Sequence, residues 1–390
     1  MNRKISLGIA LGITLIMMFV SSLGAYFFIK NKYDTALEGM PEKLLRYEYF
    51  DEVAGVIEKN YYGSVSEETL RHALTQGYVD ALGENAQYMT KEEYTRYKRE
   101  SQGDMDGIGV ACTKTSSGKI KITKVFEGSP AKNSGIKKGD IITAFDGIEV
   151  SGKNYDEMVS KLHDTLTQSV NIIYKRGKKE TDVTIKKGYE AQSLTTGVYE
   201  SIGYIDISEF YSETADKVSE ALDTFLLSGI KGVVVDLRSN SSRNYENAVK
   251  TLDLFVPMTG EEKAAASVLD EKGSVVKSYT TAPGEINVPV CVLVSQSTAA
   301  AAELFADNIR SFSKGTVYGS TTAGDALVRE AFELSDGSAL LLCTGKIVPY
   351  SAESFENSGV TPDEITESTE KNDDFKEDEL FLKAAASLLQ

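Results

Sequence analysis

The run Gly232-Val233-Val234-Val235-Asp236-Leu237 decides the fold class, because it is short, almost entirely apolar and rich in β-branched residues. Such a run predicts a strand that is buried on both faces. Val290-Cys291-Val292-Leu293-Val294 repeats the pattern downstream, and a segment with helical periodicity follows each run. Strands that alternate with helices predict an α/β domain with parallel strands at its centre. Ligand sites in such domains lie beyond the carboxyl ends of the strands, which places Arg238 to Arg243 and Ser295 to Ala300 at one rim.

Residues 104–187 have a different character, with short strand-like segments separated by glycine turns. They contain the loop Gly107-Ile108-Gly109-Val110 and, further on, Gly128-Ser129-Pro130-Ala131 and Gly135-Ile136-Lys137-Lys138-Gly139-Asp140. This series resembles a PDZ domain, a β-rich α+β module inserted ahead of the α/β domain. The resemblance implies that backbone N–H groups of the loop hold the terminal carboxylate of a peptide, which pairs with the neighbouring edge strand. The alternative is that the two loop glycines only permit a turn.

Composition excludes several classes of function. The chain has 390 residues, a net charge of −16 and 41% hydrophobic residues, so it is long enough for two or three domains with sizeable cores. The negative charge argues against nucleic acids and anionic lipid surfaces as partners. The three cysteines form no C-x-x-C pair and are expected to be structural thiols. With two histidines, no histidine-based triad, metal site or organic cofactor is expected. The cysteines are Cys112, Cys291 and Cys343, and the histidines are His72 and His163.

The amino-terminal run Ile5 to Ile29 contains no charged residue. A helix of this length measures about 37 Å and crosses a bilayer with some tilt. We therefore expect a single transmembrane helix that anchors the protein in the cell membrane, with the bulk of the chain extracytoplasmic. The alternative is a cleaved signal peptide with a cleavage site near Ser22-Leu23-Gly24. Both interpretations export everything after residue 30.

The pattern along the chain predicts five parts. Residues 42–100 have the periodicity of helices, whose apolar faces suit packing or dimerisation. The acidic stretch Glu364 to Glu379 is expected to be a solvated linker, followed by an apolar helix from Leu380 to Leu389. The parts are a cytoplasmic tip and transmembrane anchor (1–30), an N-terminal helical layer (31–103), the PDZ domain (104–190), the α/β domain (191–365), and the acidic linker with the C-terminal helix (366–390).

The order of anchor, helical layer, PDZ domain and α/β domain resembles the carboxyl-terminal processing, or tail-specific, serine peptidases. The resemblance extends from about Phe50 to Asp363 and implies a protease core of the ClpP/crotonase-like α/β class. Short motifs of that family stand in the expected places. They are Asp236-Leu237-Arg238-x-Asn240, Val292-Leu293-Val294, Glu303, Val317-x-Gly319, Leu334-Ser335-Asp336-Gly337-Ser338 and Gly359-Val360-x-Pro362-Asp363.

The resemblance also implies a catalytic apparatus. In the family, a serine at a strand-to-helix turn attacks a peptide carbonyl, and a buried neutral lysine takes up the proton of the serine. A glutamine orients the lysine, and backbone N–H groups, partly from a glycine-rich loop, stabilise the oxyanion. The family segment S-A-S-A-S-E falls without a gap on Thr298-Ala299-Ala300-Ala301-Ala302-Glu303, and T-x-G-K-G-x-V-Q falls on Thr322 to Arg329.

This alignment leaves no catalytic residue intact. It places Ala300 at the nucleophile, Asp325 at the lysine and Arg329 at the glutamine. Ser242 and Arg243 stand at the glycine pair of the oxyanion loop. A methyl group cannot attack a carbonyl, aspartate is a weak base, and a guanidinium cannot accept a proton. Asp325 and Arg329 would form an ion pair if this stretch were helical, because they are four positions apart.

The sequence therefore predicts a pseudopeptidase that binds the C-terminal tails of exported or membrane proteins through its PDZ domain, as a scaffold or regulator. Its partners would include a second copy in a homodimer or an active relative. The alternative is an active serine-type endopeptidase that cleaves near protein C-termini with a relocated nucleophile. Ser297 and Thr298 are the fallback nucleophiles and Lys314 and Lys346 the candidate bases, although hydroxyls at this turn also fit a structural role. A third interpretation is a structural relic with an idle PDZ loop.

Overall fold

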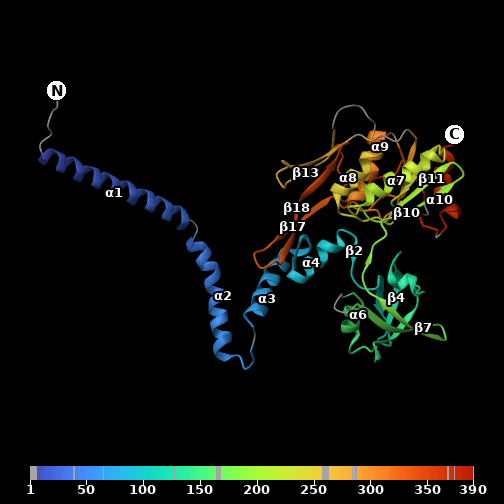
Figure 1. The fold of residues 1–390 in the computed structure, drawn as a ribbon, viewed down its shortest axis with the longest axis horizontal. Coiled ribbons are helices and arrows are strands. Elements are labelled where there is room, and N and C mark those ends of the chain that lie inside the picture. The colour runs from blue at the N-terminus through green and yellow to red at the C-terminus, as the bar shows by residue number, and fades with distance from the viewer. Residues whose placement is uncertain are drawn as a thin grey trace. The chain divides into compact units, whose positions relative to one another are not determined.

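The computed structural model describes residues 7–37, 40–64, 66–126, 128–163, 168–256, 263–282, 284, 288–313, 315–366, 369–372 and 374–389. The chain divides into two compact units, residues 1–73 and 74–390. Figure 1 shows the order of the helices and strands along the chain.

The first unit is helical. It contains α1 (Leu7–Leu37) and α2 (Met40–Asn60), and α3 (Glu67–Asp80) begins within it. Large apolar side chains of α1 are exposed, among them Phe19 and Phe28. Within the described ranges, no helix combines the length and hydropathy that crossing a membrane requires. The predicted transmembrane helix is thus not confirmed, and residues 5 and 6 of the predicted span lie outside the described residues.

The second unit starts with a helical layer that also contributes a strand. η1 (Gly83–Asn85), β1 (Ala86–Met89) and α4 (Lys91–Glu100) follow α3. α4 begins with a capping box, in which the side chains of Thr90 and Glu93 each accept a hydrogen bond from the backbone N–H of the other. The helical periodicity of this region does not predict β1, which pairs with β18 (Ala339–Pro349), far along the chain.

The next part is β-rich and has a core of its own. Its antiparallel sheet has the order β3-β4-β5-β7-β8, with β6 paired to β5, so that β3 lies at an edge. Ile108, Ile122 and Ile172 are fully buried in its core. The elements are β2 (Asp104–Met105), β3 (Val110–Lys114), β4 (Ile120–Val125), α5 (Pro130–Asn133), β5 (Ile141–Phe145), β6 (Ile148–Glu149), α6 (Tyr155–His163), β7 (Ser169–Arg176), β8 (Lys179–Lys186) and β9 (Tyr189–Glu190).

The α/β part is built on a six-stranded sheet of order β10-β11-β12-β15-β16-β19. Strand β10 is antiparallel to β11, and the other neighbours are parallel, as the sequence predicts for the centre of the sheet. The elements are β10 (Leu194–Tyr199), β11 (Ile202–Ile207), α7 (Thr214–Leu227), β12 (Gly232–Asp236), α8 (Tyr245–Asp253), β13 (Lys263–Leu269), β14 (Val275–Thr281), β15 (Val290–Val294), α9 (Ala301–Ser313), β16 (Thr316–Gly319), β17 (Leu327–Glu333), β19 (Glu364–Ile365), η2 (Phe375–Glu377) and α10 (Glu379–Ser387).

Strand β12 is buried on both faces, because helices cover both sides of the sheet. Val233 and Val235 lie in the core formed with α7, α8 and α9, whereas Val234 lies in the core formed with α10. Alternating side chains of a strand point to opposite faces, and a strand covered on both faces is apolar throughout. Burial of each such valine stabilises the fold by roughly 1.5–3 kcal/mol. The apolar run at 232–237 is thereby explained.

A second sheet, which the sequence pattern does not predict, packs against the same core. Its order is β1-β18-β13-β14, and β17 pairs with the other edge of β18. Val268, Val328 and Ile347 from this sheet are buried among side chains of α8 and α9. This sheet positions part of the candidate site, because Arg329 lies on β17 and Asp325 lies on the loop before it.

Candidate functional site

The turn between β15 and α9 carries the position that the sequence comparison assigns to a nucleophile. Ala300 lies in the left-handed region with φ of +53° and is fully buried. A non-glycine residue in this conformation is strained by roughly 1–2 kcal/mol, so the surrounding structure must hold it there. Sharp strand-to-helix turns of this kind present a nucleophile in several hydrolases. The backbone of such a turn is present, but its side chain is a methyl group.

The backbone N–H groups of this turn are all used within the protein. Ala299 donates to the carbonyl of Asn240 at 3.0 Å and Ala301 donates to the carbonyl of Ser242 at 2.8 Å. Ala300 donates to Oε2 of Glu303 at 2.8 Å. Stabilisation of an oxyanion requires N–H donors that point at the developing charge. In this conformation, these three donors are not available to a substrate.

Glu303 fixes the geometry of the turn. Its side chain is fully buried and also accepts hydrogen bonds from the hydroxyl of Thr322, from Gly324 N at 2.7 Å and from Asp325 N at 2.9 Å. One carboxylate therefore joins the start of α9 to the loop before β17. From the sequence, Glu303 is recognised only as one of the family motifs. Its position directly after a run of four alanines, Ala299 to Ala302, and before Leu304 and Phe305 is the signal that a buried acid with several partners is required.

The partner of Asp325 differs from the predicted one. Its Oδ2 pairs with Nη2 of Arg243, from the degenerate oxyanion loop, and not with Arg329. The prediction of an Asp325–Arg329 pair is wrong because the stretch is not helical: Asp325 lies in a loop and Arg329 in strand β17. The side chains of Arg243 and Asp325 are 46% and 21% exposed, so the pair itself adds only about 0–1 kcal/mol to stability. It does, however, join the loop after β12 to the loop before β17.

A cleft of about 550 Å³ lies beside this ion pair. We call it the tyrosine–arginine cleft, after the four tyrosines and two arginines of its wall. They are Tyr97, Tyr211, Tyr245, Tyr279, Arg243 and Arg329.

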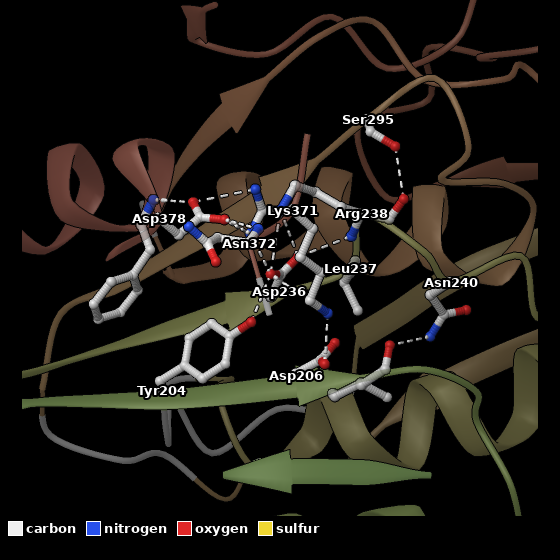
Figure 2. Close-up of polar contacts among 12 residues, drawn as sticks. Tyr204, Asp206, Asp236, Leu237, Arg238, Asn240, Ser295, Lys371, Asn372 and Asp378 are labelled. Atoms are coloured by element: carbon white, nitrogen blue, oxygen red, sulfur yellow. Dashed lines mark hydrogen bonds and ion pairs between the residues drawn. The ribbon is translucent and has the colours of Figure 1, made fainter. Parts of the chain in front are cut away.

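The loop after β12 is held by hydroxyl and amide side chains. Ser295 Oγ donates to the carbonyl of Arg238 at 2.6 Å, and Thr298 Oγ1 donates to the carbonyl of Leu237 at 2.8 Å. Asn240 Nδ2 donates to the carbonyl of Ile207 at 3.1 Å (Figure 2). Thr298 is fully buried. Its hydroxyl therefore stabilises the turn, which is the structural alternative to a role as nucleophile.

The remaining candidates for a relocated nucleophile and base are not brought together. Ser297 is exposed, and its N–H donates to Oγ of Ser295 at 3.0 Å. Lys346 pairs with Glu356 at 3.1 Å. Lys314 lies outside the described residues.

A buried charge cluster supports the same loop from the other side of the sheet. Arg238 Nη2 donates to Asp236 at 2.7 Å and to Asp378 at 2.9 Å, and all three side chains are at most 1% exposed (Figure 2). Asp378 belongs to the acidic stretch that the sequence predicts to be a solvated linker. That prediction is wrong for Asp378, because its carboxylate also caps α10 and binds a buried arginine.

Charges in this cluster shift its pKa values. Burial opposes ionisation of Asp236, but the hydrogen bonds of Arg238 and the charge of Lys371 hold the pKa of Asp236 below its usual value. The pKa of Asp378 is also lowered, because Arg238 and two backbone N–H groups outweigh its burial. The hydroxyl of Tyr204 donates to Asp236 at 2.7 Å, and Lys371 lies 2.5 Å from the carboxylate of Asp206 (Figure 2). The cluster thus fixes the start of the loop that runs from residue 238 to residue 243.

The predicted peptide-binding loop lies at the start of edge strand β3. Gly107 and Gly109 have φ of 73° and 74°. A Cβ on Gly107 would lie 2.2 Å from the carbonyl oxygen of Leu162, and one on Gly109 would lie 2.3 Å from Cβ of Ser129. Glycine is therefore required at both positions. Ile108 donates its N–H to the carbonyl of Leu162 at 3.1 Å, whereas the N–H of Gly109 has no acceptor among the residues described.

Comparisons with known proteins find the same two modules. The model of peptidase family S41 matches residues 201–366, and the model of the PDZ domain matches residues 107–186. The chain belongs to the carboxyl-terminal processing peptidases of family S41. The predicted family and the PDZ domain are thus confirmed. The family model covers the turn with Ala300, the loop with Asp325 and the loop with Ser242 and Arg243.

Relatives of this carboxyl-terminal processing peptidase homologue include bacterial proteins and one solved structure with the same fold. A probable CtpA-like serine protease of Staphylococcus aureus is 28% identical over 356 residues, which are 90% of this chain and 70% of that protein. A probable CtpA-like serine protease of Staphylococcus haemolyticus is 30% identical over 313 residues, which are 79% of this chain and 62% of that protein. The photosystem II D1 C-terminal processing protease matches with a TM-score of 0.52 and 19% identity, over 81% of this chain and 86% of that one. At this identity, the match shows the fold alone.

Proposed function

We propose that this chain is a catalytically inactive carboxyl-terminal processing homologue that binds the C-terminal tails of other proteins. The observation that carries the proposal is the turn at Ala300, where a buried methyl group replaces a nucleophile and the neighbouring N–H groups are bonded within the protein. Without a hydroxyl and without free donors for an oxyanion, acyl transfer has neither its attacking group nor its electrostatic stabilisation.

The position of the general base supports the same proposal. Asp325 stands where the family has a lysine, and its carboxylate is engaged by Arg243. A relocated nucleophile finds little support, because the hydroxyl of Thr298 donates to a backbone carbonyl and Lys346 is engaged by Glu356. An active endopeptidase would instead be revealed by cleavage of a substrate protein.

Tail binding is assigned to the loop from Gly107 to Val110. The loop leads into edge strand β3, whose free edge can pair with an extended peptide, and the N–H of Gly109 can donate to a terminal carboxylate. The N–H of Ile108 would become available only if its bond to Leu162 opened. Tails with apolar residues suit such a site.

We also propose a membrane location for the protein. The uncharged run from Ile5 to Ile29 would anchor it by a single pass, with the bulk of the chain extracytoplasmic. There it would act as a scaffold or regulator, as a homodimer or in a pair with an active relative. The anchor is tested by alkaline extraction of membranes and by protease treatment of intact cells. Release of the protein by alkali would contradict the anchor.

The catalytic part of the proposal is tested by a cleavage assay. The purified full-length chain is incubated for a day with an unfolded protein that has an apolar C-terminal tail, and the products are analysed by mass spectrometry. We expect no cleavage. A variant that carries Ala300→Ser, Asp325→Lys, Arg329→Gln and Arg243→Gly is analysed beside it. Cleavage by the wild-type chain would refute inactivity and make Ser297 the next residue to replace.

Tail binding is tested with a matched pair of glycine variants. Gly109→Val places a side chain against Ser129 and is expected to abolish binding of an apolar tail peptide. Gly177→Val introduces the same strain at a φ of +62°, in the β7–β8 turn, where an added Cβ meets no neighbouring atom. Equal loss of binding in both variants, or in neither, would contradict the assignment.

A further inference from the structure

The tyrosine–arginine cleft contains two buried polar atoms that no described residue satisfies. They are the hydroxyl oxygen of Tyr245 and Nε of Arg329. Tyr245 is only 3% exposed, so water reaches its side chain poorly. Buried polar atoms in folded proteins are nearly always hydrogen-bonded, and an unpaired one reduces stability. Two such atoms in the wall of one cleft point to a ligand that completes their hydrogen bonds.

The charges of the cleft leave one cation free. Arg243 is engaged by Asp325, and Lys277 lies 3.9 Å from the carboxylate of Glu330. The guanidinium of Arg329 has no hydrogen bond or ion pair with the part of the chain that the structure describes. A guanidinium can only donate hydrogen bonds, and it matches the two oxygens of a carboxylate.

The helix next to the cleft favours the same charge. α8 is nine residues long, and its first residues, Tyr245 and Glu246, belong to the wall of the cleft. The amino-terminal end of a helix carries a partial positive charge and attracts anions. The free guanidinium and the unpaired hydroxyl form a set of donors that lacks an acceptor, and the helix end adds only its partial positive charge, because the N–H groups of Tyr245 and Asn247 are bonded within the protein.

We propose that the tyrosine–arginine cleft binds a carboxylate of a peptide, held by Arg329 and Tyr245. This inference rests on the proposed function, because it names a ligand for the cleft beside the inactive turn that carries Ala300. In an active enzyme of this family the residue at position 329 would be a glutamine that orients the lysine. Here the arginine gives the same position a different use.

The acidic and aromatic residues of the cleft wall indicate which class of carboxylate ligand fits. Glu100, Glu209, Glu246 and Glu330 also belong to its wall, so a polyphosphate or a nucleic acid would meet several negative charges. A single carboxylate on an otherwise uncharged chain meets less of this repulsion than a polyanion does. Tyrosine rings supply amphipathic surface for the remaining part of a peptide. A volume of about 550 Å³ suits a few residues and not a folded domain.

The carboxylate can come from the end of a chain or from an aspartate or glutamate side chain, and three labelled octapeptides distinguish these sources. The first has a free C-terminal carboxylate and no acidic side chain. The second has a C-terminal amide and one internal glutamate. In the third, glutamine replaces that glutamate. Binding to the full-length chain is measured by fluorescence anisotropy in the Gly109→Val background, which removes the contribution of the PDZ loop.

We expect the first or the second peptide to bind at least about tenfold more tightly than the third, because a charge-assisted pair is formed only with a carboxylate. Arg329→Gln should abolish this preference for a peptide with a carboxylate, and Tyr245→Phe should reduce the ratio of affinities about threefold or more. Lys178→Gln removes a positive charge from the exposed β7–β8 turn and should leave the difference unchanged.

Equal affinity for all three peptides would overturn the proposal, and this comparison needs neither the Arg329 nor the Tyr245 variant to fold. An unchanged preference in both of these variants would overturn it as well. Preference for the first peptide identifies a chain end as the ligand, and preference for the second identifies an acidic side chain. Mass spectrometry of the same samples reports on the proposed function separately. Cleaved peptide would refute inactivity, whereas intact peptide without preference would refute only the carboxylate site.

Discussion

Asp378 joins the C-terminal segment to the loop after β12, and its removal should strongly destabilise the fold. Its carboxylate lies 2.9 Å from Nη2 of Arg238, accepts a hydrogen bond from Phe381 N at 2.9 Å and accepts another from Asn372 N at 3.0 Å. Removing one partner of a buried ion pair destabilises a protein by about 3–5 kcal/mol. Loss of an N-cap adds about 1 kcal/mol. Asp378→Ala should therefore reduce the free energy of unfolding by about 4–6 kcal/mol.

Asp378→Asn separates the two contributions. Asparagine caps a helix as well as aspartate does but carries no charge, so the cap of α10 is kept and the ion pair with Arg238 is lost. The free energy of unfolding of Asp378→Asn should therefore be about 1 kcal/mol higher than that of Asp378→Ala. Glu377→Ala is the control, because Glu377 is exposed and directly precedes Asp378.

The assay is unfolding of the full-length chain in urea, followed by circular dichroism, together with amide hydrogen exchange of residues 238–243. Both Asp378 variants should lose stability and exchange faster in this loop. A loss below about 1 kcal/mol, the range expected for an exposed pair, would refute the reasoning. Equal effects of Asp378→Ala and Glu377→Ala would refute it as well.

The stability that Asp378 contributes should also decrease at acidic pH. The pKa of Asp378 is lowered in the folded protein, so its ionised form stabilises the fold at every pH above the unfolded pKa of about 4. This contribution is lost as the pH falls through the lowered pKa. The stability difference between the wild-type chain and Asp378→Asn should therefore shrink below a pH of about 4. A difference that stays constant down to strongly acidic pH would contradict the assignment.

Four further variants test separate parts of the structure. Ala300→Ser alone should not restore cleavage, because the base is still missing and the N–H groups of the turn stay bonded; product peptides in a mass spectrum would contradict this. Tyr204→Phe loses a hydrogen bond to a buried carboxylate and should cost about 1–3 kcal/mol, whereas Tyr245→Phe removes an unpaired hydroxyl and should leave the melting temperature unchanged or raise it. The opposite order of melting temperatures would show that the hydroxyl of Tyr245 is paired. Burial raises the pKa of Asp253 to about 6, so the free energy of unfolding of the wild-type chain falls as the pH rises from about 4 through 6. Asp253→Asn lacks this ionisation, so its stability relative to the wild-type chain should increase over the same range. Urea midpoints at pH 4 and 7 measure this gain, and a difference that does not change with pH would exclude it.

The strands and turns that have short-range signals can be predicted from the sequence. The apolar run at 232–237 becomes β12, and the run at 290–294 becomes β15, because strands buried on both faces must be apolar throughout. The glycines of the loop at 107–110 take left-handed conformations, and the close approach of Leu162 and Ser129 leaves no room for a side chain there. The alignment onto Ala300 is consistent with the strained turn found there.

The remaining features depend on contacts between distant parts of the chain. Asp325 pairs with Arg243, which is 82 positions away, so spacing along the sequence could only suggest the nearer Arg329. The strand β1 follows a helical pattern but is fixed by β18. Asp378 lies in an acidic stretch that reads as solvated, and only the guanidinium of Arg238 explains its burial. Composition and periodicity carry no information about such partners.

The bond between Arg238 and Asp378 also bears on the time course of folding during synthesis. The two residues are 140 positions apart, so β12 and its loop leave the ribosome long before their partner exists. At about 5–20 residues per second, this interval lasts about 7–28 s. During that time the guanidinium of Arg238 has the carboxylate of Asp236 but not that of Asp378, in a sheet that still lacks the cover of α10. The nascent α/β domain must therefore wait in an incomplete form, in which chaperones can still reach one face of its central strands.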